Sequence, residues 1–307
     1  MEKTESNARR LAVLEYPYLY AAWHVCREDH ARAVSERRPF SGARRSVDLY
    51  REKGTYGKAG LPYTVEEITG APYEAIPLHF AEVCRRAAAA GDRILTSSGY
   101  CAFAPAVLGG LQQALGPEKK VGLVWVDAHC DNVIVEETER PDLRFVAVPL
   151  STIAGQTMRD WGRDFCRMAR PLTAGEILLG DGHCSGAEEY ENLARAGIDR
   201  VLPAEFADTA RWAARVQALA DRVDAIYLMV DVDILRNEYI PAYFRPEPGG
   251  HALETVLDNV RAVMRTGKVL AFSCFCVDFD KYAQGGETTF ESGRQIIEAG
   301  LAAWAET

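Results

Sequence analysis

Two short acidic motifs in this chain have the residue types and spacing of a metal site. Asp127, His129 and Asp131 alternate along VDAHCD, and Asp231 and Asp233 repeat this spacing in VDVD. Alternate residues of an extended chain point to the same side, so each motif can present its side chains together. Carboxylates gathered in a crevice repel one another, and one or two divalent cations would remove that penalty. Oxygen ligands with one imidazole suit Mn²⁺, Fe²⁺ or Zn²⁺. The competing interpretation is a set of ordinary solvated loop acids.

Each motif follows an apolar run that predicts a buried strand. The runs at 121–126 and 225–230 lead directly into the motifs, and further strands are predicted at 94–98, 176–180 and 269–277. The segments between strands have the amphipathic pattern of helices, over 80–90, 104–115, 187–197, 205–223 and 252–267. Apolar strands separated by helices indicate a parallel sheet covered on both faces. Because ligands bind at the carboxyl ends of such strands, the position of both motifs favours a functional site.

We expect one domain over residues 1–307, because the chain has no internal repeat, low-complexity tract or linker. Residues 1–75 form an irregular N-terminal part in this interpretation, and residues 76–307 form the core. The predicted fold class is α/β, with three α/β/α layers around a mostly parallel central sheet.

Composition and charge argue against several classes of protein. The formal net charge of −9 disfavours nucleic acid as a main partner, since phosphate binding needs a basic face. The N-terminus lacks a secretory signal pattern, and no segment reaches the roughly 18 apolar residues of a transmembrane helix. The cysteines are scattered, so we expect reduced thiols in a cytoplasmic protein.

The motifs resemble those of the ureohydrolase superfamily, which includes arginase and agmatinase. VDAHCD is similar to the family's DAHxD, and DVDILRNEYIPAYFRPEPGG is similar in spacing to DVDxLDPxxAPxxxxPEPGG. ILTSSGYCAFAPAVLGGL stands in place of the family's GGDHS and the helix after it. The resemblance covers residues 76–306 and implies an arginase-like fold, hydrolysis of a C–N bond in a small molecule, and a homo-oligomer.

The resemblance also implies a binuclear manganese centre built from six residues: the bridging Asp127 and Asp231, His129 and Asp233 in one site, and Asp131 and Cys101 in the other. Asp131 is in addition a candidate catalytic residue. Water ionised by the metal would attack the guanidinium carbon without a separate strong base.

Two cysteines stand where the family has functional residues. The family's first ligand histidine falls on Cys101, and the glutamate that holds the guanidinium falls on Cys276. A thiolate at Cys101 would favour Zn²⁺ or Fe²⁺, and a plain thiol there would leave a single-metal centre. Without the glutamate a guanidinium loses its partner, so free arginine is not the expected substrate. Cys276 is therefore a candidate catalytic and substrate-binding residue, and Cys274 should face the same way.

Other positions supply candidates for substrate binding and proton transfer. His183 could shuttle protons in place of a missing family histidine, or be a hydrogen-bonded loop residue. Tyr100 could donate to a substrate oxygen or serve in packing. Asn132 replaces a shifted family asparagine, and Glu188 could retain a contact with substrate.

Two function hypotheses follow. The first is a metal-dependent hydrolase of a C–N bond in a guanidino, amidine or amide compound, with Mn²⁺ as the expected cofactor. The second is a catalytically altered or non-hydrolytic arginase-fold protein, such as a pseudoenzyme or a specialised biosynthetic protein. The retained carboxylates and imidazole favour the first, and the lost histidines and glutamate favour the second. An Fe²⁺-dependent oxidative role rests only on the softer ligand at Cys101.

Overall fold

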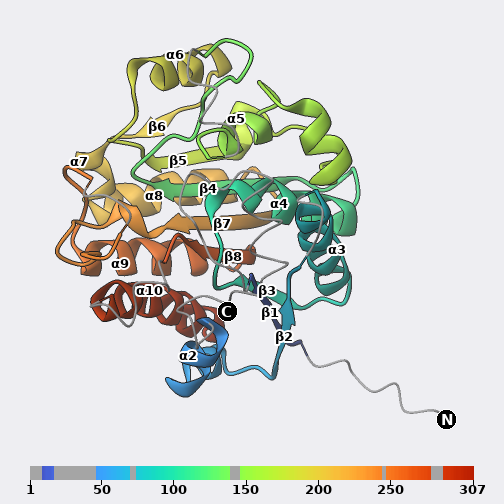
Figure 1. The fold of residues 1–307 in the computed structure, drawn as a ribbon, viewed down its shortest axis with the longest axis vertical. Helices are drawn as coiled ribbons and strands as arrows, with labels where there is room; N and C mark the ends of the chain where they lie inside the picture. Colours follow the sequence, from blue (N-terminus) through green and yellow to red (C-terminus); the bar gives the residue numbers. More distant parts are fainter. Residues whose placement is uncertain (1–8, 17–45, 70–73, 139–145, 244–246, 278–285) are drawn as a thin grey trace.

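A computed structural model describes residues 9–16, 46–69, 74–138, 146–243, 247–277 and 286–307. One sheet runs through them in the order β2-β1-β3-β8-β7-β4-β5-β6, and every neighbouring pair of strands is parallel. Figure 1 shows the strands stacked in this order with helices on both sides. The predicted α/β/α fold class is confirmed.

The eight strands are β1 (Leu11–Glu15), β2 (Tyr63–Glu67), β3 (Arg93–Thr96), β4 (Val121–Asp127), β5 (Ile177–Asp181), β6 (Arg200–Val201), β7 (Ala225–Asp231) and β8 (Val269–Phe275). The strands predicted from apolar runs appear as β3, β4, β5, β7 and β8. Both β4 and β7 are buried along their whole length. Helices cover both faces of the sheet there, which explains the unbroken apolar sequences.

The expectation of an irregular N-terminal part is wrong for the described residues before position 76. β1 and β2 lie there, pair with each other in parallel, and join the sheet through β3. β2 is a partly exposed strand at the sheet edge with the polar sequence YTVEE. β6, also missed, has only two residues. β1 is a buried five-residue strand, as long as β5, and the prediction overlooked it.

The helices form two groups. α3 (Ala75–Ala89) packs on α4 (Ala104–Leu115), while α9 (Leu253–Met264) packs between α8 (Thr209–Ala220) and α10 (Glu287–Ala305). The crossovers through α3 and α4 run along the sheet in one direction, and those through α8 and α9 run back. Right-handed crossovers therefore place the two groups on opposite faces. The shorter helices are α2 (Ser46–Glu52), α5 (Pro149–Ile153), α6 (Ala187–Ala196) and α7 (Pro203–Phe206).

The single helix predicted over 205–223 is divided into α7 and α8. Asp208 lies between them, and its carboxylate accepts hydrogen bonds from the N–H groups of Ala210 and Arg211, both at 3.2 Å. This is the N-cap arrangement that begins a new helix. The amphipathic pattern continues through the break, so the pattern alone cannot locate it.

Small residues set the spacing between these layers. On α4, a Cβ added to Gly110 would lie 2.4 Å from the carbonyl oxygen of Ala81 on α3. In β5, a Cβ on Gly180 would lie 2.9 Å from the ring of Trp212 on α8. Trp212 is buried and donates its indole N–H to the Asn259 carbonyl of α9 at 3.0 Å. The rigid packing around β4, β5 and β7 supports the loops that follow these strands.

Candidate metal centre

The carboxyl ends of β7 and its two neighbours bring the predicted residues together. β4 ends at Asp127 and β7 ends beside it at Asp231. On the other side of β7, Asp231 pairs with Phe275, and Cys276 is the next residue of the chain. The acidic motifs therefore meet at one edge of the sheet, as predicted from their positions after the strands.

Asp127, His129 and Asp233 form what we call the oxygen–imidazole group, with one ligand atom of each within 4.8 Å of the others. His129 Nδ1 lies 2.9 Å from Asp233 Oδ2 and 3.5 Å from Asp127 Oδ1. The backbone orients both carboxylates: Asp233 Oδ1 accepts from the Ala128 N–H at 3.1 Å, and Asp127 Oδ1 accepts from the His129 N–H at 2.7 Å.

Cys101, Asp231 and Cys276 form a second cluster, the sulfur–oxygen group, whose ligand atoms also lie within 4.8 Å of one another. All three residues are buried. Asp231 Oδ1 accepts a hydrogen bond from the Asp233 N–H at 3.1 Å, and this bond joins the two groups. The sequence interpretation gave Cys276 a substrate role and no part in binding a metal.

Asp131 lies outside both groups. It is buried with a φ of 49°, a left-handed conformation that aspartate tolerates better than most residues. Its carbonyl accepts from the Leu150 N–H at 3.0 Å, and its carboxyl interacts with the Cys101 thiol. A ligand role for Asp131 beside Cys101 stays a prediction.

Burial dominates the electrostatics of these acids. It raises the pKa of Asp127 and of Asp231, and repulsion from Asp233 raises both further. Burial also raises the pKa of Asp131, to about 7. Burial opposes the charge of Asp233 as well, but the adjacent His129 outweighs it and lowers that pKa. Burial acts to lower the pKa of His129, but the negative charge of Asp233 has the larger effect, so the pKa of His129 is raised. One imidazole does not balance four buried carboxyl groups, and one or two divalent cations would offset most of their negative charge.

One buried atom of the oxygen–imidazole group tests whether a cation fits. Asp127 Oδ2 is buried without a hydrogen-bond partner, on the carboxylate whose Oδ1 lies 3.5 Å from His129 Nδ1. A buried polar atom without a partner is costly and rare in folded proteins. The His129 side chain is 22% exposed, so an ion from solvent can approach this side of the group. Carboxylate oxygens and imidazole nitrogen at these separations fit a divalent cation such as Mn²⁺ or Zn²⁺.

Two residues beside this group had no role in the sequence interpretation. Glu247 is buried and places Oε1 3.5 Å from His129 Nε2, an ionic contact without hydrogen-bond geometry. Tyr243 donates its hydroxyl to Asp233 Oδ2 at 3.0 Å. Partners of this kind orient metal ligands. The PEPGG motif was an available signal for Glu247, whereas no sequence feature distinguishes Tyr243.

Gly250 holds the PEPGG segment against the loop that follows β7. Its φ is +86°, and an added Cβ would lie 2.7 Å from the Leu235 carbonyl. His251 donates its N–H to Ile234 at 2.9 Å, and Arg236 donates back to the His251 carbonyl at 3.0 Å. Only glycine permits both this conformation and this approach, which fixes the backbone near Glu247.

His183 belongs to a separate polar cluster at the end of β5. Asp181 Oδ1 lies 3.1 Å from His183 Nδ1, an ion pair without hydrogen-bond alignment, and Asp181 Oδ2 contacts His251 Nε2. His183 Nε2 donates to the Pro248 carbonyl at 2.9 Å. Asp181 raises the pKa of His183 to about 10. His183 is a member of neither ligand group, and the sequence gave no signal for Asp181 or His251.

The other predicted substrate-binding residues lie in different surroundings. Tyr100 is buried and packs on Phe103, with ring centroids 4.6 Å apart. Asn132 is fully buried, and neither polar atom of its side-chain amide has a hydrogen-bond partner. Glu188 is exposed in the first turn of α6 and accepts from the Thr138 hydroxyl at 3.3 Å. Their substrate roles stay predictions.

The expectation that Cys274 and Cys276 face the same way assumes an unbroken strand, but β8 ends at Phe275. Cys276 has a φ of 65° and donates its N–H to the Gly99 carbonyl at 2.9 Å. The Cys274 thiol instead contacts the Gly293 carbonyl of α10 at 3.9 Å. The two thiols therefore have different partners.

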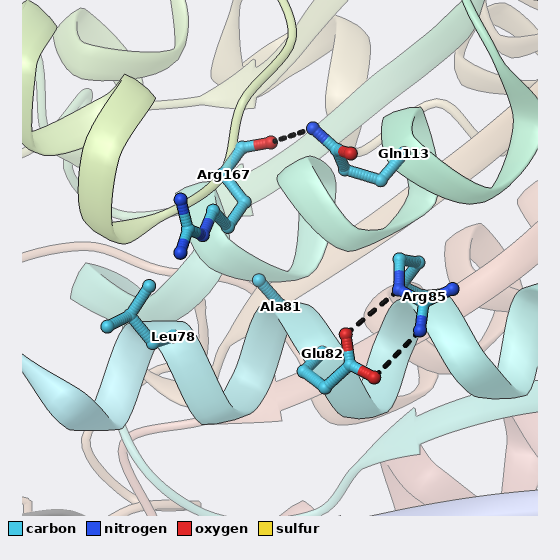
Figure 2. Close-up of a pocket in the computed structure, with 6 residues that line it drawn as sticks. All are labelled: Leu78, Ala81, Glu82, Arg85, Gln113 and Arg167. Carbon is cyan, nitrogen blue, oxygen red and sulfur yellow. Dashed lines mark hydrogen bonds and ion pairs between the residues drawn. The ribbon is translucent and has the colours of Figure 1, made fainter.

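A hollow of about 450 Å³ lies away from these clusters, between α3, α4 and the loop at Arg167 (Figure 2). Its lining residues are Leu78, Ala81, Glu82, Arg85, Gln113 and Arg167. Glu82 pairs with Arg85 at 2.8 Å, and Gln113 donates to the Arg167 carbonyl at 3.1 Å. None of the predicted site residues lines this hollow, and we assign it no function.

The fold and the clustered side chains define an α/β protein with a carboxylate–imidazole centre at the ends of its parallel strands. The arginase family model matches residues 61–299. The chain belongs to the arginase family, a family of metal-dependent hydrolases, and this confirms the predicted superfamily. Among curated proteins, the arginase of Eremothecium gossypii is 27% identical over 246 residues. That match covers 78% of this chain but only 57% of the length of the relative.

Solved structures share the fold at low sequence identity. The arginase of Entamoeba histolytica in complex with L-ornithine matches with a TM-score of 0.75 and 16% identity, over 96% of this chain and 98% of that one. Bacillus subtilis arginase matches with a TM-score of 0.76 and 14% identity, over 95% of this chain and 98% of that one. A variant of Trypanosoma cruzi formiminoglutamase with Mn²⁺ matches with a TM-score of 0.72 and 12% identity, over 99% of this chain and 96% of that one.

Each helix of the described residues is too short or too polar to cross a bilayer.

Proposed function

We propose that this protein is a metal-dependent hydrolase that cleaves a C–N bond in a guanidino, amidine or amide compound other than free arginine. The observation that carries the proposal is the oxygen–imidazole group, in which His129 Nδ1 faces Asp233 at 2.9 Å and Asp127 at 3.5 Å. Two buried carboxylates that face one imidazole nitrogen suit a divalent cation. Family membership and the Mn²⁺ in the formiminoglutamase structure support the same conclusion.

Asp127, His129 and Asp233 would hold one divalent ion, and Asp231, Asp131 and Cys101 are the candidates for a second. When bound, such an ion supplies a Lewis acid and a water of lowered pKa. Tyr243 and Glu247 then keep Asp233 and His129 in place. We propose Mn²⁺ as the physiological ion of the oxygen–imidazole group, with Zn²⁺ or Fe²⁺ as the alternatives.

The substrate proposal rests on Cys276. Its position corresponds to the carboxylate that pairs with a guanidinium in the family resemblance, and a thiol cannot form that ion pair. Asn132 supplies a buried amide whose donor and acceptor atoms have no hydrogen-bond partner, which suits an uncharged amide substrate. We propose Tyr100 and Glu188 as further substrate contacts.

His183 would act as a proton donor. Its pKa of about 10 keeps the imidazole protonated near neutral pH, so it is equipped to give a proton to a leaving amine and poorly equipped to remove one. Asp181 and the Pro248 carbonyl hold the ring at both nitrogens.

We further propose a cytoplasmic homo-oligomer that acts on a small molecule. The seven cysteines of the described residues are all free of disulfides, as expected in a reducing compartment. Light scattering on the purified protein measures the oligomeric state.

A second candidate function is a catalytically altered or non-hydrolytic arginase-fold protein. It is favoured by the thiols at Cys101 and Cys276, which occupy positions of a ligand histidine and a substrate carboxylate in the resemblance and are both buried. A protein that binds metal at the oxygen–imidazole group but turns over no C–N substrate would support this candidate.

The test combines elemental analysis with a turnover screen. Protein purified without chelator is analysed for metal, reloaded with Mn²⁺, and assayed for urea, ammonia or amine release from guanidino, amidine and amide compounds. We expect bound metal and turnover in the wild type, and at least a ~100-fold loss of turnover in Asp233→Asn with the fold intact. Asp224→Asn is the control, because Asp224 pairs with Lys119 away from the centre. Wild-type protein that binds neither Mn²⁺, Zn²⁺ nor Fe²⁺ would refute the proposal.

A further inference from the structure

We infer that Cys101, Asp231 and Cys276 form a sulfur-containing metal site that prefers Zn²⁺ to Mn²⁺, beside the oxygen–imidazole group. The inference deepens the proposed function, because it assigns Cys276 to metal binding and gives the two halves of the centre different chemistry. It rests on the convergence of two thiols and one carboxylate within 4.8 Å of one another.

The three side chains come from three adjacent parts of the sheet. Cys101 follows β3, Asp231 ends β7, and Cys276 follows β8, which lies between those two strands. Cys101 and Cys276 are thus brought together by the fold across 175 positions of sequence, and not by a local CxxC turn. Both sit with Asp231 at the carboxyl edge where the family resemblance places the metal centre.

The backbone of Cys276 directs its thiol into this cluster. A φ of 65° is uncommon for a residue with a side chain. The conformation is held by the hydrogen bond from the Cys276 N–H to Gly99, two residues before Cys101. The same bond therefore fixes the spacing between the segments that carry the two thiols.

Apolar filling does not account for the cluster. Cys101, Asp231 and Cys276 are at most 5% exposed, and a buried carboxylate is a poor neighbour for thiols that serve only as hydrophobic packing. Cys274, two residues earlier in the chain, shows the packing alternative, since its buried thiol faces the Gly293 carbonyl of α10 and is not a member of the cluster. A cation would satisfy the carboxylate and both sulfurs at once.

The chemistry of the ligand atoms decides which cation the sulfur–oxygen group prefers. Thiolates are soft donors that select zinc and iron, whereas Mn²⁺ takes oxygen and imidazole ligands. The oxygen–imidazole group offers two carboxylates and a nitrogen, and the sulfur–oxygen group offers two sulfurs and a carboxylate. Each thiol that becomes a ligand gives its proton to solvent, so binding here releases protons.

The experiment uses Co²⁺ as a spectroscopic probe, because cobalt bound to thiolate shows a charge-transfer absorption that cobalt bound to oxygen and nitrogen lacks. Metal-free protein in a phosphine reductant is titrated with Co²⁺, followed by competition with Zn²⁺ and Mn²⁺. We expect the thiolate absorption in wild type and in Cys274→Ser, its loss in Cys101→Ser and Cys276→Ser, and at least ~10-fold weaker Zn²⁺ binding in those two variants. Zn²⁺ should displace the cobalt signal at lower concentration than Mn²⁺.

Asp233→Asn separates this inference from the proposed function, since it changes a member of the oxygen–imidazole group and no member of the sulfur–oxygen group, and should keep the thiolate absorption. Wild-type protein that binds Co²⁺ without thiolate absorption would overturn the inference and leave the proposed function standing. Wild-type protein that binds no ion would overturn both. A disulfide between Cys101 and Cys276, found by mass spectrometry in alkylated protein taken from reducing buffer, would also contradict the inference.

Discussion

The imidazole Nδ1 of His129 lies 2.9 Å from Oδ2 of Asp233, although the two residues follow different strands and are separated by more than a hundred positions of sequence. The contact exists because β4 and β7 are parallel neighbours whose carboxyl ends coincide. Each of the two side chains has a further protein partner, Glu247 for His129 and Tyr243 for Asp233. These four residues give the clearest means of testing whether the centre is built for a cation.

Removing the Tyr243 hydroxyl should weaken metal binding without unfolding the protein. In Tyr243→Phe, Asp233 Oδ2 loses a hydrogen-bond donor that orients it, and we expect a 10–100-fold weaker apparent affinity for Mn²⁺ or Zn²⁺. Calorimetric titration of metal-free protein measures the affinity. Tyr239→Phe is a matched control, because the Tyr239 hydroxyl contacts Arg236 and not a predicted ligand. Equal affinities in both variants would show that Tyr243 does not support the centre.

The buried amide of Asn132 should contribute to function and little to stability. Because neither of its polar atoms is hydrogen-bonded, we expect Asn132→Leu to change the free energy of unfolding by less than about 1 kcal/mol while it abolishes turnover. Asn259→Leu provides the comparison: the Asn259 amide donates to the Phe206 carbonyl at 2.7 Å, so its loss should cost about 1–3 kcal/mol. Urea denaturation measures the free energy of unfolding of each variant. A large destabilisation by Asn132→Leu would indicate a structural role.

The ion pair between His183 and Asp181 should make stability depend on pH. The folded pKa of His183, about 10, lies above the ordinary value near 6.5 of the unfolded chain. The protonated imidazole therefore stabilises the fold fully below about pH 6.5, and this contribution is lost as pH rises toward 10. We expect His183→Gln to be less stable than wild type by about 1–3 kcal/mol at pH 6, with the difference shrinking at higher pH. A difference that grows with pH would contradict the assignment.

Gly250 should be intolerant of a side chain. In Gly250→Ala the new Cβ meets the Leu235 backbone at 2.7 Å in addition to adopting a positive φ, so we expect a loss of more than about 2 kcal/mol together with weaker metal binding. Gly267→Ala is the matched control, with a φ of +70° and no atom within 4 Å of the new Cβ, and should cost only about 1 kcal/mol. Thermal denaturation compares the two. Similar losses would mean that the approach to Leu235 relaxes easily.

The sequence was sufficient for the central sheet because β4, β7 and β8 are buried on both faces and leave long apolar runs. It was insufficient for β2 and β6, which are exposed or very short, and for the break at Asp208, which leaves the helical pattern intact. β1 is buried and as long as β5, and it was overlooked. The clustering of Asp127, His129 and Asp233 could be predicted because the spacing of the acidic motifs and their position after the strands agree. Tyr243, Asp181 and the contact between Cys101 and Cys276 were not, because each depends on how distant segments meet.

The central claim is that a divalent cation binds among Asp127, His129 and Asp233, and crystals grown with Mn²⁺ and with Zn²⁺ test it most directly. Anomalous difference maps at the two metal edges locate and count the ions. We predict a peak beside His129 Nδ1 and between the carboxylates of Asp127 and Asp233, with metal–ligand distances of about 2.0–2.2 Å. Maps without a peak there, from crystals in which these three side chains stay together, would contradict the account.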